Sequence, residues 1–259
     1  MLESLSPARR RLLLGLVVLV VVATGAAVLA LVRGGRAPEV DQAVPGPVVV
    51  VPGYGGDVGS VEPVRRLLTA AGREVSVVDT PGDGTGDLRD QARTLGEVVD
   101  EALAASGADS VDLVGYSAGG VVARWYVREL DGADVVRRVV TLGSPHHGTD
   151  NAATALAAAG SCPPACEQLA PDSDLLRRLN AGDETPAGPR WATLRTQDDT
   201  VVVPVDSAAL EGATNVLVQQ VCPAATTTHG ELPGDPVTRE LLAAALGEAA
   251  PSAPTSAAC

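Results

Sequence analysis

The fold of this 259-residue chain is decided by the stretch Val111-Asp-Leu-Val-Gly115-Tyr-Ser117-Ala-Gly119-Gly120. Its first four residues are typical of a buried strand, and the apolar spacing over 118–130 predicts a helix. So sharp a turn from strand to helix forces a strained backbone at Ser117, and glycines at 115 and 119 remove side chains that would clash. The stretch therefore predicts a serine presented at the amino end of a helix, where the helix dipole favours negative charge. An idle serine in a glycine-rich turn is the weaker interpretation.

Strands and helices alternate along the rest of the body. The run of valines at 48–51 indicates a strand buried on both faces of a sheet. Further strands are predicted at 74–78, 111–114, 135–142, 191–195 and 215–221, and helices at 61–71, 88–102, 118–130 and 236–246. This alternation predicts an α/β domain over 48–246, with a mostly parallel sheet and helices on both faces. The segment 151–189 is an insertion after the strand that follows the serine's helix.

Composition favours a globular body and limits the partners. Hydrophobic residues make up 46% of the chain and charged residues 20%, and the formal net charge is −13. No arginine-rich stripe with interleaved aromatic residues is present in the body, so a polyanionic nucleic acid would be repelled. We expect a monomer with no nucleic-acid partner.

The first 37 residues read as a targeting segment. Three arginines at 9–11 precede 21 uncharged residues, 12–32. As a helix this run would span about 32 Å, enough for a bilayer core of roughly 30 Å. A retained anchor and a signal peptide cleaved near Ala23-Thr24-Gly25 both remain open, and both predict an extracytoplasmic domain. Residues 38–47 read as a linker, and 247–259 as a disordered tail.

Four cysteines suit an exported, disulfide-bonded protein. Cys162 and Cys166 form the preferred pair, and Cys222 with Cys259 is a possible second pair. Zinc is less well supported because no second ligand pair follows at finger spacing. Neither a metal nor a cofactor is expected.

A serine hydroxyl needs a base, and a base needs an orienting acid. In this architecture the chain order is serine, acid, histidine, which favours His229 after the last strand. Asp199 is the preferred acid, with Asp198 as the alternative and Asp206 as a weaker third. His146 and His147 come too early in the chain to be the base, and we expect them to shape the wall of the site.

The oxyanion of a tetrahedral intermediate needs two backbone donors. The sequence favours the N–H of Ala118, directly after the serine, and the N–H of Tyr54 in the glycine-rich loop after the first strand. That loop lacks the spacing of a nucleotide-binding motif.

Five segments together resemble a known family. They are VVVVPGYGGD, VDLVGYSAGGVVARWY, VTLGSPHHGTD, TQDDTVVVP and TTTHG, and their order is that of the motifs in small secreted bacterial lipases and esterases of the α/β-hydrolase superfamily. The resemblance covers about 48–246. It implies a triad of Ser117, Asp199 and His229, and an oxyanion hole at Tyr54 and Ala118. The implied activity is hydrolysis of carboxylic esters, such as acylglycerols, through an acyl-enzyme.

The chain departs from the smallest of these lipases at two places. Pro52 stands where many of them carry histidine, and the insertion 151–189 is longer, so that it could form a partial lid or serve as packing tied by cysteines. Two alternatives keep the same scaffold: an acyltransferase of the cell envelope that uses the same triad, and a catalytically idle envelope-binding protein.

Overall fold

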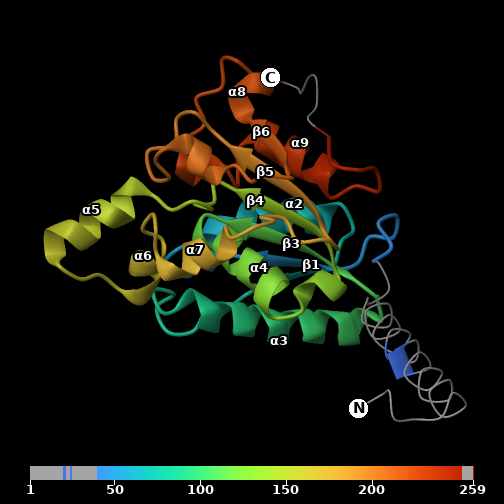
Figure 1. The fold of residues 1–259 in the computed structure, drawn as a ribbon. Coiled ribbons are helices and arrows are strands. Elements are labelled where there is room, and N and C mark those ends of the chain that lie inside the picture. Colours follow the sequence, from blue (N-terminus) through green and yellow to red (C-terminus); the bar gives the residue numbers. More distant parts are fainter. Residues whose placement is uncertain (1–19, 22–23, 25–39, 253–258) are drawn as a thin grey trace, which may run out of the picture. The chain divides into compact units, whose positions relative to one another are not determined.

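The computed structural model describes residues 20–21, 24, 40–252 and 259. The chain divides into two compact units, Met1–Glu39 and Val40–Cys259, and the second holds every strand of the described sheet (Figure 1). The predicted targeting segment lies outside the described residues apart from Val20, Val21 and Thr24. Within the described part of the chain, no helix combines the length and the apolar character needed to cross a membrane.

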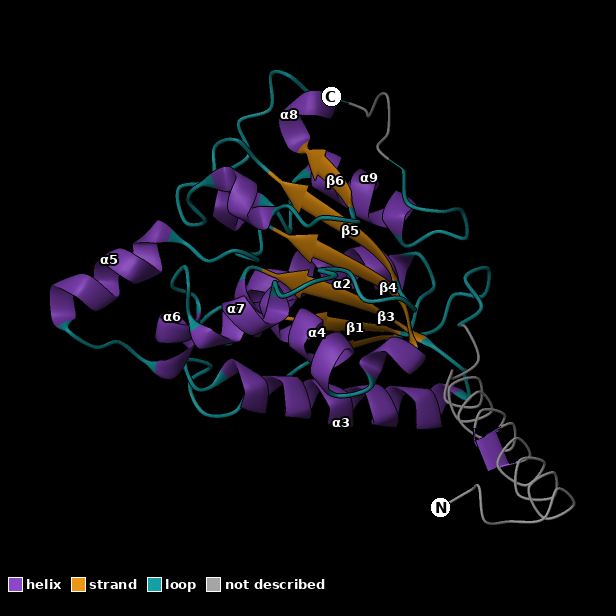
Figure 2. Cartoon of the chain, viewed as in Figure 1, coloured by secondary structure: helices purple, strands orange, loops and turns teal. Residues whose placement is uncertain are grey.

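The core of the second unit is a six-stranded parallel sheet (Figure 2). The strands lie in the order β2-β1-β3-β4-β5-β6, and all five pairings are parallel. The order reverses between β1 and β3, and ligands of open parallel sheets bind beyond the carboxyl ends of strands at such a reversal. The strands are β1 (Val48–Val51), β2 (Val75–Val77), β3 (Val111–Tyr116), β4 (Val136–Leu142), β5 (Arg190–Arg195) and β6 (Thr214–Leu217).

Helices cover both faces of the sheet, which confirms the predicted α/β class. Strand β1 explains the arrangement, because successive side chains of a strand point to opposite faces. Val49 and Val51 join the core under α3 (Leu88–Ser106) and α4 (Ala118–Glu129). Val48 and Val50 join the core under α2 (Glu62–Ala70) and α9 (Pro236–Ala245). A strand buried on both faces needs an unbroken apolar run, and the four valines supply one.

The predicted last strand is too long by four residues. We predicted 215–221, but β6 ends at Leu217 and Val218–Val221 form a short helix, α8. The apolar spacing of this stretch fits a strand and a helical turn equally well. The helical turn is capped by the Gln220 side chain, whose Oε1 accepts the backbone N–H of Leu217 at 3.2 Å. It also directs Gln219 into the protein interior, where that residue is 8% exposed.

The insertion packs at one end and projects at the other. Helices α6 (Pro164–Gln168) and α7 (Asp174–Leu179) bury Ala165, Leu175 and Leu176 in the core on the α3/α4 side. Helix α5 (Asp150–Ala159) extends away from the sheet (Figures 1 and 2) and buries only Ala152. A lid role for this helix stays a prediction.

One of two disulfides, together with a buried arginine, holds the C-terminal segment to the body. Cys162 is bonded to Cys166, and Cys222 is bonded to Cys259. The predicted tail begins with residues held to the body, because the Arg137 guanidinium donates to the carbonyl oxygen of Gly247 at 3.0 Å. Residues 253–258 of that tail lie outside the described residues.

Candidate active site

Ser117 occupies the turn between β3 and α4 in a strained conformation. Its backbone has φ 52° and ψ −125°, and its N–H donates to the carbonyl oxygen of Leu142 at 2.8 Å. The turn leaves no room for side chains on either side. A Cβ on Gly115 would lie 2.5 Å from the Cα of Gly120, and one on Gly119 would lie 2.3 Å from the carbonyl oxygen of Val51. The strain and the need for glycine both agree with the sequence prediction.

Three of the predicted site residues form one chain of hydrogen bonds. His229 Nε2 lies 3.0 Å from Ser117 Oγ, and His229 Nδ1 lies 2.7 Å from Asp199 Oδ2. Asp199 and His229 are both 6% exposed, so water competes little for these bonds. The second carboxylate oxygen, Asp199 Oδ1, accepts the backbone N–H groups of Val201 and Val202, each at 2.8 Å. These two bonds hold the carboxylate in the orientation that faces His229.

The structure separates the three candidate acids. Asp198 Oδ2 accepts from the Gln219 amide at 3.3 Å and has no hydrogen bond to His229. Asp206 pairs with Arg195 at 3.3 Å, and its side chain is 89% exposed. Among these carboxylates, only Asp199 is hydrogen-bonded to the imidazole.

Two neighbours of His229 were not singled out from the sequence. The Tyr116 hydroxyl donates to the carbonyl oxygen of His229 at 3.2 Å, and the two rings lie 5.3 Å apart. Burial, with a smaller contribution from the negative charge of Asp199, raises the pKa of Tyr116 to about 12, so this hydroxyl stays protonated. Gly143 has φ 56°, and a Cβ there would lie 3.1 Å from His229 Nδ1. The only sequence signal for Gly143 was its place in the Thr-Leu-Gly-Ser-Pro motif.

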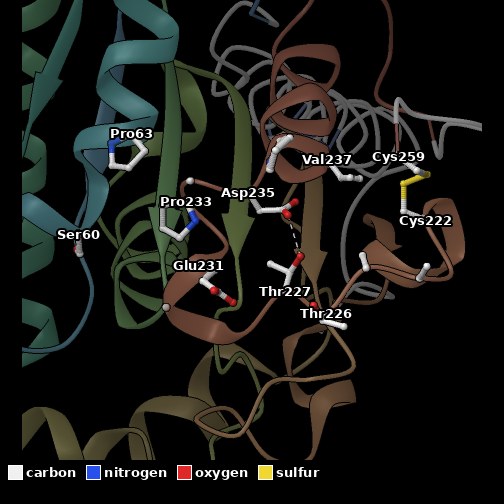
Figure 3. A pocket seen from close by; sticks show the side chains of 15 residues that line it. Ser60, Pro63, Cys222, Thr226, Thr227, Glu231, Pro233, Asp235, Val237 and Cys259 are labelled. Carbon is white, nitrogen blue, oxygen red and sulfur yellow. Dashed lines mark hydrogen bonds between the residues drawn. A yellow bond between two sulfur atoms is a disulfide. The ribbon is translucent and has the colours of Figure 1, made fainter.

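Further contacts brace the loop that carries His229 from its outer side. Figure 3 shows one of them, in which the Thr227 hydroxyl donates to Asp235 Oδ2 at 2.8 Å. In a second contact the Thr228 hydroxyl donates to Glu231 Oε2 at 2.6 Å. A cavity of about 620 Å³ lies along this outer side, lined by residues that include Pro63, Thr227, Glu231 and Asp235. None of Ser117, Asp199 and His229 lines it. We therefore do not assign the cavity to the reacting substrate.

The loop after β1 packs against the serine turn. A Cβ on Gly53 would lie 3.1 Å from the Cβ of Ser117, so the backbone that leads into Tyr54 passes close to the hydroxyl. Ala118, the first residue of α4, is 2% exposed and begins the helix directly after Ser117. Backbone N–H groups bind the oxyanion in acyl transfer, and the assignment of Tyr54 and Ala118 to that role stays a prediction.

The two early histidines form hydrogen bonds with residues other than Ser117, and their expected part in the wall of the site stays a prediction. His147 Nε2 lies 2.7 Å from Glu184 Oε1. His146 is completely buried, and its Nε2 lies 3.0 Å from Thr141 Oγ1. Burial is the largest cause that keeps the pKa of His146 well below the usual 6.5, and the nearby Arg124 and His147 add to it. Neither histidine is hydrogen-bonded to Ser117.

A serine on a strained strand-to-helix turn of a parallel sheet defines the α/β-hydrolase class. The family model described as the alpha/beta hydrolase fold matches residues 46–159, and the chain has this fold throughout the described sheet. The match and the sheet topology together show that the chain has the α/β-hydrolase fold.

Solved structures of lipases share the fold. Aspergillus fumigatus lipase B superposes with a TM-score of 0.69 at 22% identity, over 78% of this chain and 52% of that one. The propeptide form of Bacillus licheniformis lipase BlEst2 gives 0.66 at 20% identity, over 82% and 52%. Its mature form gives 0.57 at 21% identity, over 71% and 86%. This chain spans about half the length of the first two proteins. At these identities the likeness shows the fold.

Proposed function

We propose that this protein is a serine hydrolase of carboxylic esters. The observation that carries the proposal is the hydrogen-bonded chain from Asp199 through His229 to Ser117, at the carboxyl edge of a parallel sheet. The family model and the lipase structures with the same fold support a hydrolase, and the names of those lipases favour esters or lipids as substrates.

The proposed reaction transfers the acyl group in two steps. Ser117 Oγ attacks the ester carbonyl carbon as its proton passes to His229 Nε2, and Asp199 stabilises the imidazolium that forms. The N–H groups of Tyr54 and Ala118 bind the oxyanion. The C–O bond to the alcohol then breaks, and His229 returns its proton to the leaving oxygen. In the second step His229 removes a proton from water, and the water oxygen attacks the acyl carbon. The bond from that carbon to Ser117 Oγ then breaks, His229 returns the proton to Oγ, and the acid is released.

We further propose that the reaction takes place outside the cytoplasm. Two disulfides fit an oxidising compartment, because cytosolic proteins keep their thiols reduced. The uncharged run 12–32 is consistent with export as an anchor or a signal peptide.

The first test removes the nucleophile. The purified full-length protein is assayed in detergent against p-nitrophenyl esters from acetate to palmitate. Ser117→Ala should lower kcat by roughly 10⁴- to 10⁶-fold with an unchanged circular dichroism spectrum. A fluorophosphonate probe should label wild type and not the variant. Activity in Ser117→Ala close to that of wild type would contradict the proposal.

The second test separates the neighbouring carboxylates. Asp199→Asn should lower kcat by about 10⁴-fold, because an amide at this position no longer fixes the productive tautomer of His229. Asp198→Asn is the matched control, since Asp198 is adjacent in sequence and has no bond to His229. Equal losses in the two variants would remove Asp199 from the mechanism.

A further inference from the structure

One buried amide side chain joins the two loops that carry Asp199 and His229. Gln219, on α8, donates through Nε2 to Thr196 Oγ1 at 2.9 Å and to the carbonyl oxygen of Ala225 at 3.2 Å. The same nitrogen lies 3.3 Å from Asp198 Oδ2, and Gln219 Oε1 accepts the backbone N–H of Gln197 at 3.0 Å. The side chain therefore contacts the loop before Asp199 and the loop before His229 at once.

A threonine hydroxyl completes the connection. Thr196 is fully buried, and its Oγ1 donates to the carbonyl oxygen of Thr227 at 2.6 Å. The same oxygen accepts from Gln219 and from the backbone N–H of Asp198, the latter at 3.3 Å. Thr196 precedes Asp199 by three residues, and Thr227 precedes His229 by two.

These bonds lie where the geometry of the proposed triad depends on two separate loops. Asp199 and His229 belong to different loops, yet their side chains must stay 2.7 Å apart. Buried networks whose members are all satisfied make a local geometry rigid. A misplacement of about 1 Å at a reacting group can cost about 100-fold in rate.

We infer that Gln219 and Thr196 are positioning residues that hold Asp199 against His229. This inference rests on the proposed function, because it assigns the pair a role in that reaction. Neither residue has a hydrogen bond to Ser117, so both act through the acid and the base.

The chain offers a matched control in Asn215 on β6. Its side chain also makes several part-buried hydrogen bonds: Nδ2 donates to the carbonyl oxygens of Leu210 and Ala213, and Oδ1 accepts from Thr193 Oγ1 at 2.8 Å. None of these partners belongs to the loops that carry Asp199 and His229. A loss that comes only from weakened packing should therefore be shared by Asn215→Leu.

The experiment measures kinetics in the full-length protein. Gln219→Met and Thr196→Val should each lower kcat by up to about 100-fold with KM changed less than about 2-fold. Thr196→Ser, which keeps the hydroxyl, should restore most of the activity. In an Asp199→Asn background Gln219→Met should have almost no further effect, because the pair it holds is already broken. Losses that add fully in the double variant, or an equal kcat loss in Asn215→Leu, would overturn the inference.

A second readout does not depend on activity. The His229 Nδ1 proton, assigned by its loss in His229→Gln, should give a low-field NMR signal that broadens in Gln219→Met and Thr196→Val and stays sharp in Asn215→Leu. An unchanged signal in both positioning variants would contradict the inference. If wild type neither hydrolyses esters nor reacts with a fluorophosphonate, the proposed function fails, and this NMR comparison still decides whether the two residues hold Asp199 against His229.

Discussion

At the scale of single residues, the energetic cost of the site is concentrated at Ser117. Among the residues that the structure describes, three that are not glycine have positive φ: Ser117, Asp131 and Asp172. Aspartate enters the left-handed region with modest strain, whereas serine does so rarely. Such a backbone costs of order 1–3 kcal/mol and persists only where its surroundings enforce it. The bond from the Ser117 N–H to Leu142 and the close packing of the adjacent glycines enforce it here.

His146 should make stability depend on pH. In the folded protein it is neutral, because burial first and then Arg124 and His147 hold its pKa well below 6.5. Unfolding exposes the imidazole, which then takes up a proton as the pH falls below about 6.5. The free energy of unfolding should therefore fall on acidification, with a slope from this residue approaching about 1.4 kcal/mol per pH unit. Above this range the contribution is fully retained.

Urea unfolding of wild type and His146→Asn, measured between about pH 7.5 and about pH 5.5, tests this slope. The wild type should lose more stability over this interval than the variant. Parallel curves for wild type and His146→Asn would contradict the prediction.

At the scale of elements, the site depends on how closely α4 approaches β1 and β3. A side chain on Gly115 would clash with the Cα of Gly120. A side chain on Gly119 would clash with the carbonyl oxygen of Val51, at the end of β1. The turn therefore brings the amino end of α4 and the loop after β1 to the same side of Ser117. Strands β1 and β3 are neighbours in the sheet. The two N–H groups proposed to bind the oxyanion, those of Tyr54 and Ala118, therefore follow the ends of adjacent strands.

Gly115→Ala should disrupt this arrangement. Its Cβ would lie 2.5 Å from the Cα and 2.6 Å from the N of Gly120, and backbone atoms cannot give way as a flexible side chain can. We expect a loss of about 1–3 kcal/mol in the free energy of unfolding, together with loss of esterase activity. Gly86→Ala should change stability by less than about 0.5 kcal/mol, because nothing lies within 4 Å of that position. Urea unfolding measures both, and equal effects would show that the turn is not tightly packed.

At the scale of the whole molecule, the two disulfides close loops of very different length. The bond between Cys222 and Cys259 spans a sequence separation of 37, and Cys222 belongs to the core beneath α9. The bond between Cys162 and Cys166 spans a separation of only 4, within the insertion. A disulfide that closes a longer loop restricts the unfolded chain more.

Removing the long-range disulfide should therefore cost more stability. Replacing both Cys222 and Cys259 by alanine should lower the free energy of unfolding by about 4 kcal/mol, against about 2 kcal/mol for the Cys162 and Cys166 pair. Chemical denaturation of the two double variants measures the difference. A larger loss for the short-range pair would contradict the prediction.

The sequence by itself determined the features that depend on neighbouring residues. The valine run of β1, the apolar spacing of α4 and the glycines around Ser117 are local patterns, so the parallel sheet and the serine turn followed from them. The chain order of serine, acid and histidine left His229 as the preferred base among the three histidines. The local pattern failed at Val218–Val221, where a strand and a helical turn present the same apolar residues.

Only the tertiary structure decided what depends on distance between remote segments. Asp198 and Asp199 are alike in sequence, and the loop around Val201 and Val202 turns only Asp199 toward His229. The pairing of Cys222 with Cys259 and the bridging position of Gln219 have no local signal either. The physical reason is that a side chain's direction and its partner are set by packing between loops far apart in the chain, and residue type and spacing carry no record of that packing.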